Sequence, residues 1–261
     1  MNTESTSLAL VNSAPAQWRH FARFIQRPAL PAQSANEMGG QTASFGARLT
    51  TGLVAVLRML ALDLVIMIAL LSLVLVFVLA GGELPSNALN DLELTPIVIL
   101  SLVIGAPLLE ELGFRSWLSG RPRYLSVIPI LMIAAAAAAS IGVARTGEDA
   151  SEGTAIALLG GIIVAIIASL IVWKRPPMRW FQAIFPLAFW VSALGFALIH
   201  IANYKEGDWY ALLPLVLPQL VLGTVCAYLR VHHGLWSAML LHALHNGIIV
   251  LFVLAGLSMT Q

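Results

Sequence analysis

Residues 60–80 read LALDLVIMIALLSLVLVFVLA, and Asp63 is the one charged side chain among them. A helix needs about 20 apolar residues to cross the hydrocarbon core of a bilayer, so this stretch predicts a transmembrane helix. The composition of the whole chain agrees with that prediction. Of its 261 residues, 59% are hydrophobic and 10% are charged, and so few charges cannot cover the surface of a soluble domain.

Further apolar runs of similar length follow the first one, and they predict an all-α bundle of about seven transmembrane helices. Prolines in three of these runs could kink or break a helix, which leaves the count open by one span in either direction. The further runs are 94–112, 125–144, 154–173, 181–201, 211–229 and 235–257.

The distribution of charge orients the predicted bundle. Twelve of the fourteen basic residues, Arg230 among them, fall in the N-terminal region or in every second loop, and the two exceptions are Arg145 and Lys205. The alternate loops are mainly acidic. Cytoplasmic loops of membrane proteins carry the excess of Lys and Arg. We therefore expect a cytoplasmic N-terminus, in a multi-pass protein of a bacterial inner membrane.

Residues 1–47 are polar or mixed in character and predict a cytoplasmic tail ahead of a membrane domain at 48–261. Within the tail, Arg19, Arg23 and Arg27 recur every four residues, with aromatic and aliphatic side chains between them. This pattern predicts a helix at 16–27 that lies on an anionic membrane surface. A disordered basic arm is the alternative.

Ionisable side chains inside apolar runs are costly, on the order of 2.5–3.5 kcal/mol each, and they mark functional or tightly paired sites. For Asp63 we favour an ion pair with Arg58 near the membrane interface over a functional role. The other polar residues of interest within the runs are Glu110, Glu111, His200, His242, His245 and the neutral Asn246.

The two glutamates differ in their helical position. Glu111 and Arg115 are four residues apart on one helix face and can form an ion pair, whereas Glu110 points about a third of a turn away. A carboxylate left unpaired in a low dielectric binds a proton more readily, which suits Glu110 to act as a general base towards water. The alternative is that both glutamates share Arg115 in a buried structural network.

The histidines also come with spaced partners. Phe196 precedes His200 by one helical turn and can restrict its ring. His242 and Asn246 are four residues apart, so both can donate hydrogen bonds to a developing oxyanion. His245 lies on a neighbouring part of the same helix face, and spacing does not decide which of the two histidines faces the site.

Taken in order, these motifs resemble those of the CAAX-protease and bacteriocin-processing (Abi) family of membrane proteins. The resemblance covers residues 95–120 and 181–255 and implies an intramembrane endopeptidase that depends on glutamate. It also implies a role for each matching residue. Glu110 and His200 would activate water, His242 and Asn246 would stabilise the oxyanion, and Glu111, Arg115 and Phe196 would support the site.

No cofactor is expected from the sequence, although one glutamate and two histidines are possible zinc ligands. Cys226 is the single cysteine, so the chain has no disulfide framework and no site built of several thiolates. The expected partners are the lipid bilayer and a peptide or membrane-protein substrate, lipidated substrates included. The net charge of +1 predicts no nucleic-acid partner.

The chain departs from the family pattern between its first two motifs. About eighty residues separate Arg115 from Phe196, some two spans more than we expect of the family, and 125–173 is the predicted insertion. A rise of 1.5 Å per residue puts Glu110 and His242 about 12 Å deep but His200 about 30 Å along its helix. We therefore expect residues 180–186 to lie in the interface or to be strongly tilted. A transporter and a catalytically silent scaffold or immunity protein are the alternatives to a protease.

Overall fold

A computed structural model describes residues 13–31, 44–87, 92–125 and 148–258, together with 130, 133, 134, 137 and 140. These residues form helices and connecting segments, and the only β-type pairing within this part of the chain is an isolated bridge between Asn87 and Tyr204. The predicted all-α class is therefore confirmed. The chain divides into two compact units, Met1–Ser116 with Phe185–Gln261, and Trp117–Ile184.

Five helical segments are long and apolar enough to cross a membrane, and each coincides with a predicted run. They are Phe45–Leu79, Pro96–Phe114, Arg179–Asn203, Trp209–His233 and Leu235–Gly256. The predicted run at 154–173 lies largely within α8 (Glu148–Ile171), and most of 125–144 lies outside the described residues. A total of seven spans, like the orientation of the termini, stays a prediction.

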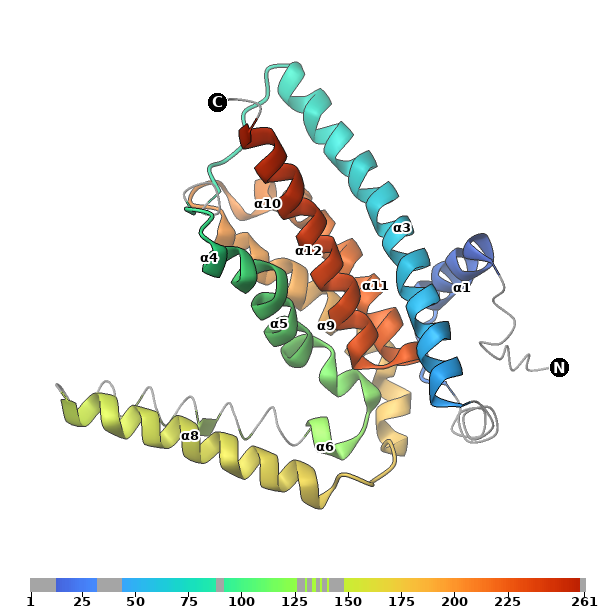
Figure 1. Cartoon of the computed structure of the whole chain (residues 1–261), viewed down its shortest axis with the longest axis vertical. Coiled ribbons are helices and arrows are strands. Elements are labelled where there is room, and N and C mark those ends of the chain that lie inside the picture. The colour runs from blue at the N-terminus through green and yellow to red at the C-terminus, as the bar shows by residue number, and fades with distance from the viewer. Residues whose placement is uncertain are drawn as a thin grey trace. The chain divides into compact units, whose positions relative to one another are not determined.

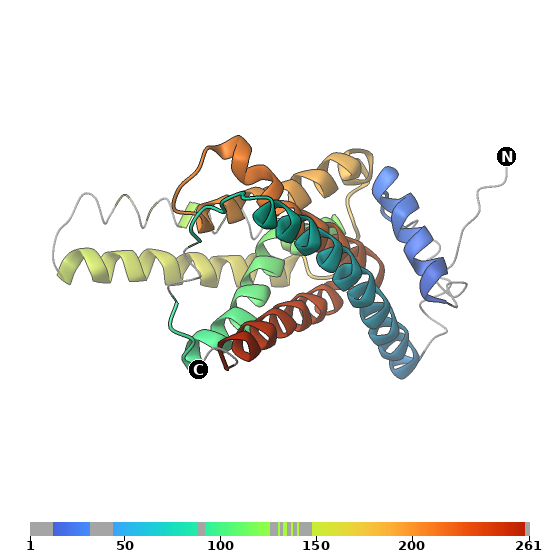
Figure 2. The same cartoon turned by 90° about the horizontal axis from the view of Figure 1, so that it is seen from above.

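Helix α12 (Leu235–Ser258) is central to the first unit. It packs against α11 (Leu217–His233), α3 (Phe45–Leu79) and α5 (Ala106–Phe114), as Figures 1 and 2 show. Gly234 joins α11 to α12 at φ +100°, a backbone conformation that favours glycine. Because Gly52 of α3 has no side chain, the ring of Trp236 can lie directly against it. Helices α3, α5 and α11 thus meet around α12.

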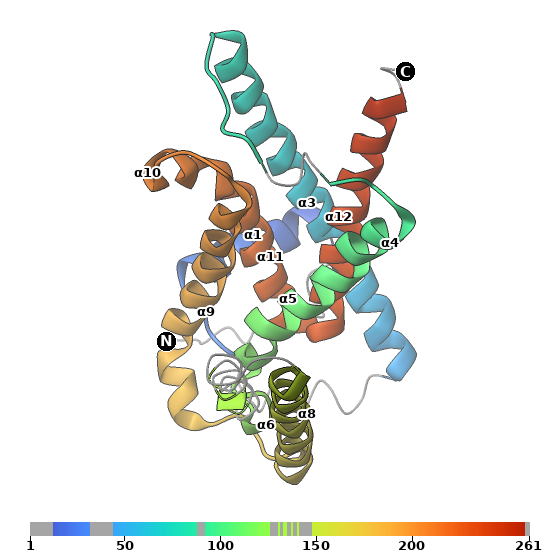
Figure 3. The same cartoon turned by 90° about the vertical axis from the view of Figure 1, so that its left-hand side faces the viewer.

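The second span is one helix with an irregular centre. It consists of α4 (Pro96–Leu100), the π-helix η3 (Ser101–Gly105) and α5, which continue into one another in Figure 3. The amide of Ala106 donates to the carbonyl of Ser101, which lies five residues before it. In an α-helix the acceptor would be the carbonyl four residues before the donor. The prolines of this run therefore do not break the helix, but its hydrogen-bond spacing changes.

Helix α1 (Ala14–Gln26) packs against α3 and α11. Its buried face includes Phe24, whose ring centroid lies 5.3 Å from that of Phe189 and 5.5 Å from that of Tyr228. The indole N–H of Trp18 donates to the carbonyl of Arg58 at 2.9 Å. The aromatic face of this helix thus contacts protein, and its predicted contact with a lipid surface stays a prediction.

The span at Arg179–Asn203 consists of α9 (Arg179–Ile199) and η5 (His200–Asn203), and α10 (Trp209–Leu212) and η6 (Leu213–Val216) precede α11 in the next span. The short helices η4 (Ser116–Ser119) and α6 (Pro122–Leu125) follow α5. In the second unit, α6 packs against α8 and the guanidinium of Arg123 lies 4.4 Å from the ring centroid of Trp173. This unit contains residues 125–173, whose status as an insertion stays a prediction.

Candidate active site

Glu111 and Arg115 form the buried ion pair that their spacing predicts. Glu111 belongs to α5 and Arg115 is the C-cap residue of that helix. The Arg115 NH1 nitrogen lies 3.2 Å from Glu111 Oε1, and neither side chain is exposed. Removing either of these two buried charges would be strongly destabilising, because the remaining charge would be buried without a compensating partner. This pair is therefore the fixed part of the site.

Aromatic rings enclose the arginine. The guanidinium carbon of Arg115 lies 3.9 Å from the ring centroid of Phe196 and 5.6 Å from that of Phe114, distances typical of cation–π contacts. Gly223 of α11 leaves room for both side chains, since a Cβ atom at this position would lie 3.0 Å from Arg115 NH2 and 3.2 Å from Phe196 Cδ1. The glycine lets α11 pack closely against the ion pair.

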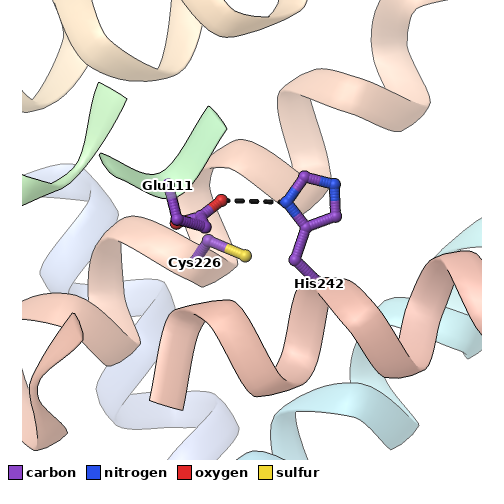
Figure 4. Close-up of side chains that lie close together, drawn as sticks. All are labelled: Glu111, Cys226 and His242. Carbon is purple, nitrogen blue, oxygen red and sulfur yellow. Dashed lines mark hydrogen bonds and ion pairs between the residues drawn. The ribbon is translucent and has the colours of Figure 1, made fainter. Parts of the chain in front are cut away.

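His242 of α12 joins the two glutamates. Its Nδ1 lies 3.0 Å from Glu111 Oε1, the contact drawn in Figure 4, and its Nε2 lies 3.6 Å from Glu110 Oε2. A carboxylate only accepts hydrogen bonds, so Nδ1 carries the hydrogen in its contact with Glu111. The side chain of Glu110 is 30% exposed and that of Glu111 is not exposed at all. The two neighbouring glutamates thus have different environments around one imidazole.

Phe196 links His200 to the same cluster. The Phe196 ring centroid lies 4.7 Å from that of His200 and 5.6 Å from that of His242. The Nδ1 atom of His200 lies 2.7 Å from the Phe196 carbonyl oxygen, which can only accept, so Nε2 of the neutral ring is free to bind a proton. His200 therefore shares a neighbour with His242, despite the greater distance along its own helix that the sequence suggested.

Asn246 lies on the same helix as His242, but its contact is to the backbone of the second span. Its amide nitrogen donates to the carbonyl oxygen of Leu102, in η3, at 2.9 Å. A carboxamide has two N–H groups, so this bond leaves one of them for another acceptor.

His245 has a separate partner. Its Nδ1 lies 2.6 Å from Oδ2 of Asp63, whose side chain is fully buried in α3. The question left open by spacing is thereby answered, because His242 faces the glutamates and His245 faces α3. The sequence suggested Arg58 as the partner of Asp63, and it gave no signal for His245, which is 182 positions away.

Cys226 is a site residue that sequence reasoning missed. Figure 4 shows its sulfur beside Glu111 and His242, and one ligand atom of each of these three residues lies within 4.8 Å of the others. Glutamate, cysteine and histidine are a possible zinc set by donor type. The charges do not favour that metal, because the Arg115 cation already lies 3.2 Å from Oε1 of the same carboxylate.

Arg230 was also missed, because its charge was assigned to a cytoplasmic loop. In the structure it is a buried residue of α11. It donates from Nε to the carbonyl of Arg115 at 3.0 Å and from NH2 to that of Ser116 at 2.7 Å. Carbonyls at the end of a helix have no partners within it, and a cation is favourable there. Arg230 therefore fixes the end of α5 immediately after the glutamates.

An apolar bundle that buries two arginines, a glutamate and two histidines defines an integral membrane protein with an internal polar centre. The comparisons with known proteins identify it further. The chain belongs to the type II CAAX prenyl endopeptidase Rce1-like family, whose model matches residues 92–248, more than half of the chain. No curated protein and no solved structure matches it. Membership confirms the resemblance and supports an intramembrane endopeptidase in general.

Proposed function

We propose that the chain hydrolyses a peptide bond within the membrane, with Glu110 as the general base and His200 as a second acceptor for the same water. One observation carries this proposal, the asymmetry of the two glutamates around His242. Glu111 is fully buried and engaged by Arg115, whereas Glu110 is 30% exposed and lies 3.6 Å from the other imidazole nitrogen. A base must be open to water, and only Glu110 is.

The charges of the cluster support a role for His242 in binding the oxyanion. Two carboxylates and one guanidinium leave a net charge of −1, so a protonated His242 makes the group neutral. Buried charges are least costly when they are compensated. A protonated ring donates from both nitrogens, with Nδ1 directed to Glu111 and Nε2 to the side of Glu110, where the reaction would take place.

The reaction then follows in two steps. The carboxylate of Glu110 takes a proton from the water, whose oxygen attacks the scissile carbonyl carbon while His200 Nε2 holds the second hydrogen. The carbonyl oxygen becomes an oxyanion that accepts from His242 Nε2–H and from the remaining N–H of Asn246. When the C–N bond breaks, the leaving nitrogen receives the proton held by Glu110. Glu111, Arg115 and Phe196 do not touch the substrate but keep His242 in place.

An apolar surface beside the glutamates favours a membrane-borne substrate. Leu108, Leu109 and Leu112 of α5 are 42%, 72% and 47% exposed, so Glu110 stands next to side chains suited to contact lipid. We propose a peptide or membrane-protein substrate, lipidated substrates included, in a bacterial inner membrane. Exposed aliphatic side chains in such numbers are otherwise unfavourable in water.

The proposal is tested by cleavage of membrane-derived and prenylated peptides by the full chain in detergent and ¹⁸O-labelled water. We expect one labelled oxygen in the new carboxyl terminus, because water is the nucleophile. A His200→Ala protein should cleave about 10²-fold more slowly, the lower end of what a positioned proton acceptor contributes. Transport of a solute without any labelled product would contradict the proposal and favour the transporter.

A chelator separates the proposed mechanism from a zinc enzyme. Cleavage is expected to continue unchanged after incubation with a strong chelator, because the Arg115 cation beside Glu111 opposes a divalent ion. Cleavage in the presence and absence of chelator is compared for the wild type and for Cys226→Ser, which removes one of the three possible ligands. Complete loss with chelator that added zinc restores would assign the cluster to the metal instead.

A further inference from the structure

The π-helix of the second span leaves a backbone carbonyl without a helical donor. The amide of Ala106 donates to Ser101 instead of to Leu102, its partner in an α-helix. In the spacing that this bond sets, Leu102 would accept from residue 107, which is a proline and has no N–H. The shift in spacing and the proline together deprive Leu102 of a donor from its own helix.

Asn246 supplies the missing donor from a different helix. Its side-chain amide lies 2.9 Å from the Leu102 oxygen, and η3 and α12 pack against each other. A carbonyl without a partner is unfavourable where it is partly withdrawn from water, so a donor at this point stabilises the π spacing. The next residue of α12 is Gly247, and a Cβ atom there would lie 3.6 Å from Val103. The small residue permits the close contact that the hydrogen bond requires.

The same face of α12 therefore holds the second span at two points. His242 contacts the two glutamates of α5, and Asn246, one helical turn further, contacts Leu102 of η3. Since a helix turns about 100° per residue, the wider π turn changes the direction in which residues beyond it face. The direction of the glutamates thus depends on whether η3 keeps its π spacing.

We propose that Asn246 is a positioning residue, which holds the π-helix through the Leu102 carbonyl and thereby directs Glu110 and Glu111 towards His242. Its link to catalysis rests on the proposed function, and its link to the helix does not. The bond to Leu102 also fixes the plane of the carboxamide. The second N–H is then held in one direction, as a donor to an oxyanion needs to be.

The test compares Asn246→Leu, which keeps the approximate side-chain volume and removes both N–H donors, with the wild-type full chain in detergent. Ser258→Ala is the matched control, because Ser258 also donates to a backbone carbonyl on α12, but in an exposed position within its own helix. Three quantities are measured. They are the unfolding temperature, the rate at which a maleimide reacts with Cys226 in the folded protein, and the pH dependence of kcat/KM for peptide cleavage.

For Asn246→Leu we expect an unfolding temperature about 5 °C lower, as the loss of the donor to the part-buried Leu102 carbonyl predicts. Cys226 is the single cysteine and is fully buried beside Glu111, so its maleimide reaction should become about tenfold faster when α5 moves. The pH profile of kcat/KM should shift, because the charges around His242 are rearranged. Ser258→Ala should behave as the wild type in all three measurements.

The alternatives have different signatures. If Asn246→Leu lowers cleavage but keeps the wild-type unfolding temperature and Cys226 protection, Asn246 is an oxyanion donor only and the proposal is wrong. If the unfolding temperature falls while the pH profile keeps its shape, Asn246 supports the fold without directing the glutamates, which also overturns it. If the wild type cleaves no peptide, the proposed function fails, and the first two measurements still decide whether Asn246 holds the π-helix.

Discussion

The Glu110→Gln protein is expected to lose about 10³-fold in kcat for peptide cleavage while it unfolds at the wild-type temperature. Glutamine has nearly the same shape as glutamate, but its amide cannot take a proton from water. The side chain is 30% exposed and the His242 imidazole lies 3.6 Å from it, so little stability depends on it. Single-turnover cleavage and thermal unfolding in the same detergent measure the two effects separately.

Glu111→Gln is the matched control for this experiment, since it makes the same chemical change one residue further along α5. The glutamine keeps an oxygen that accepts from His242 but removes the charge that compensates Arg115. Its main effect should therefore be a lower stability and not a lower kcat. If Glu111→Gln abolished cleavage at unchanged stability, and Glu110→Gln did not, the roles of the two glutamates would be the reverse of those proposed.

Hydropathy predicted the positions of five spans, because lipid-facing helices are apolar on nearly every side. It placed the beginning of the first apolar run at residue 60, whereas α3 begins at Phe45. The additional turns are less apolar, and they are helical because Gly52, Ala55 and Met59 recur at helical spacing and are buried. That periodicity was visible in the sequence, but an apolar run identifies a span by average composition and not by its packed face.

Local spacing also predicted the Glu111–Arg115 ion pair, since residues four apart on a helix are neighbours whatever the fold. The contact between His242 and Glu111 joins positions 131 apart, and only the order of family motifs indicated it. No pattern pointed to Cys226, because a lone cysteine in an apolar helix is ordinary. Arg230 was assigned to a cytoplasmic loop, because the distribution of charge indicates the side of the membrane on which an arginine lies but not what the arginine binds.

The Arg115→Met protein is expected to lose about 3 kcal/mol of the free energy of unfolding, or roughly 6–12 °C in unfolding temperature. Methionine fills most of the space above Phe196 but carries no charge. Glu111 would then remain fully buried without the guanidinium, and its Oε2 atom has no hydrogen-bond partner among the described residues even in the native protein. Thermal unfolding in detergent, followed by circular dichroism, measures the loss.

Two variants determine where that loss comes from. Arg48→Met makes the same change at an exposed arginine of α3 and should alter stability by less than about 0.5 kcal/mol. Arg115→Met combined with Glu111→Gln removes both charges and should recover part of the stability, because breaking a buried pair costs more than removing it. A double variant as unstable as Arg115→Met alone would show that packing against Phe196 matters more than charge. An Arg115→Met protein as stable as Arg48→Met would contradict the buried ion pair itself, and with it the physical basis for distinguishing Glu110 from Glu111.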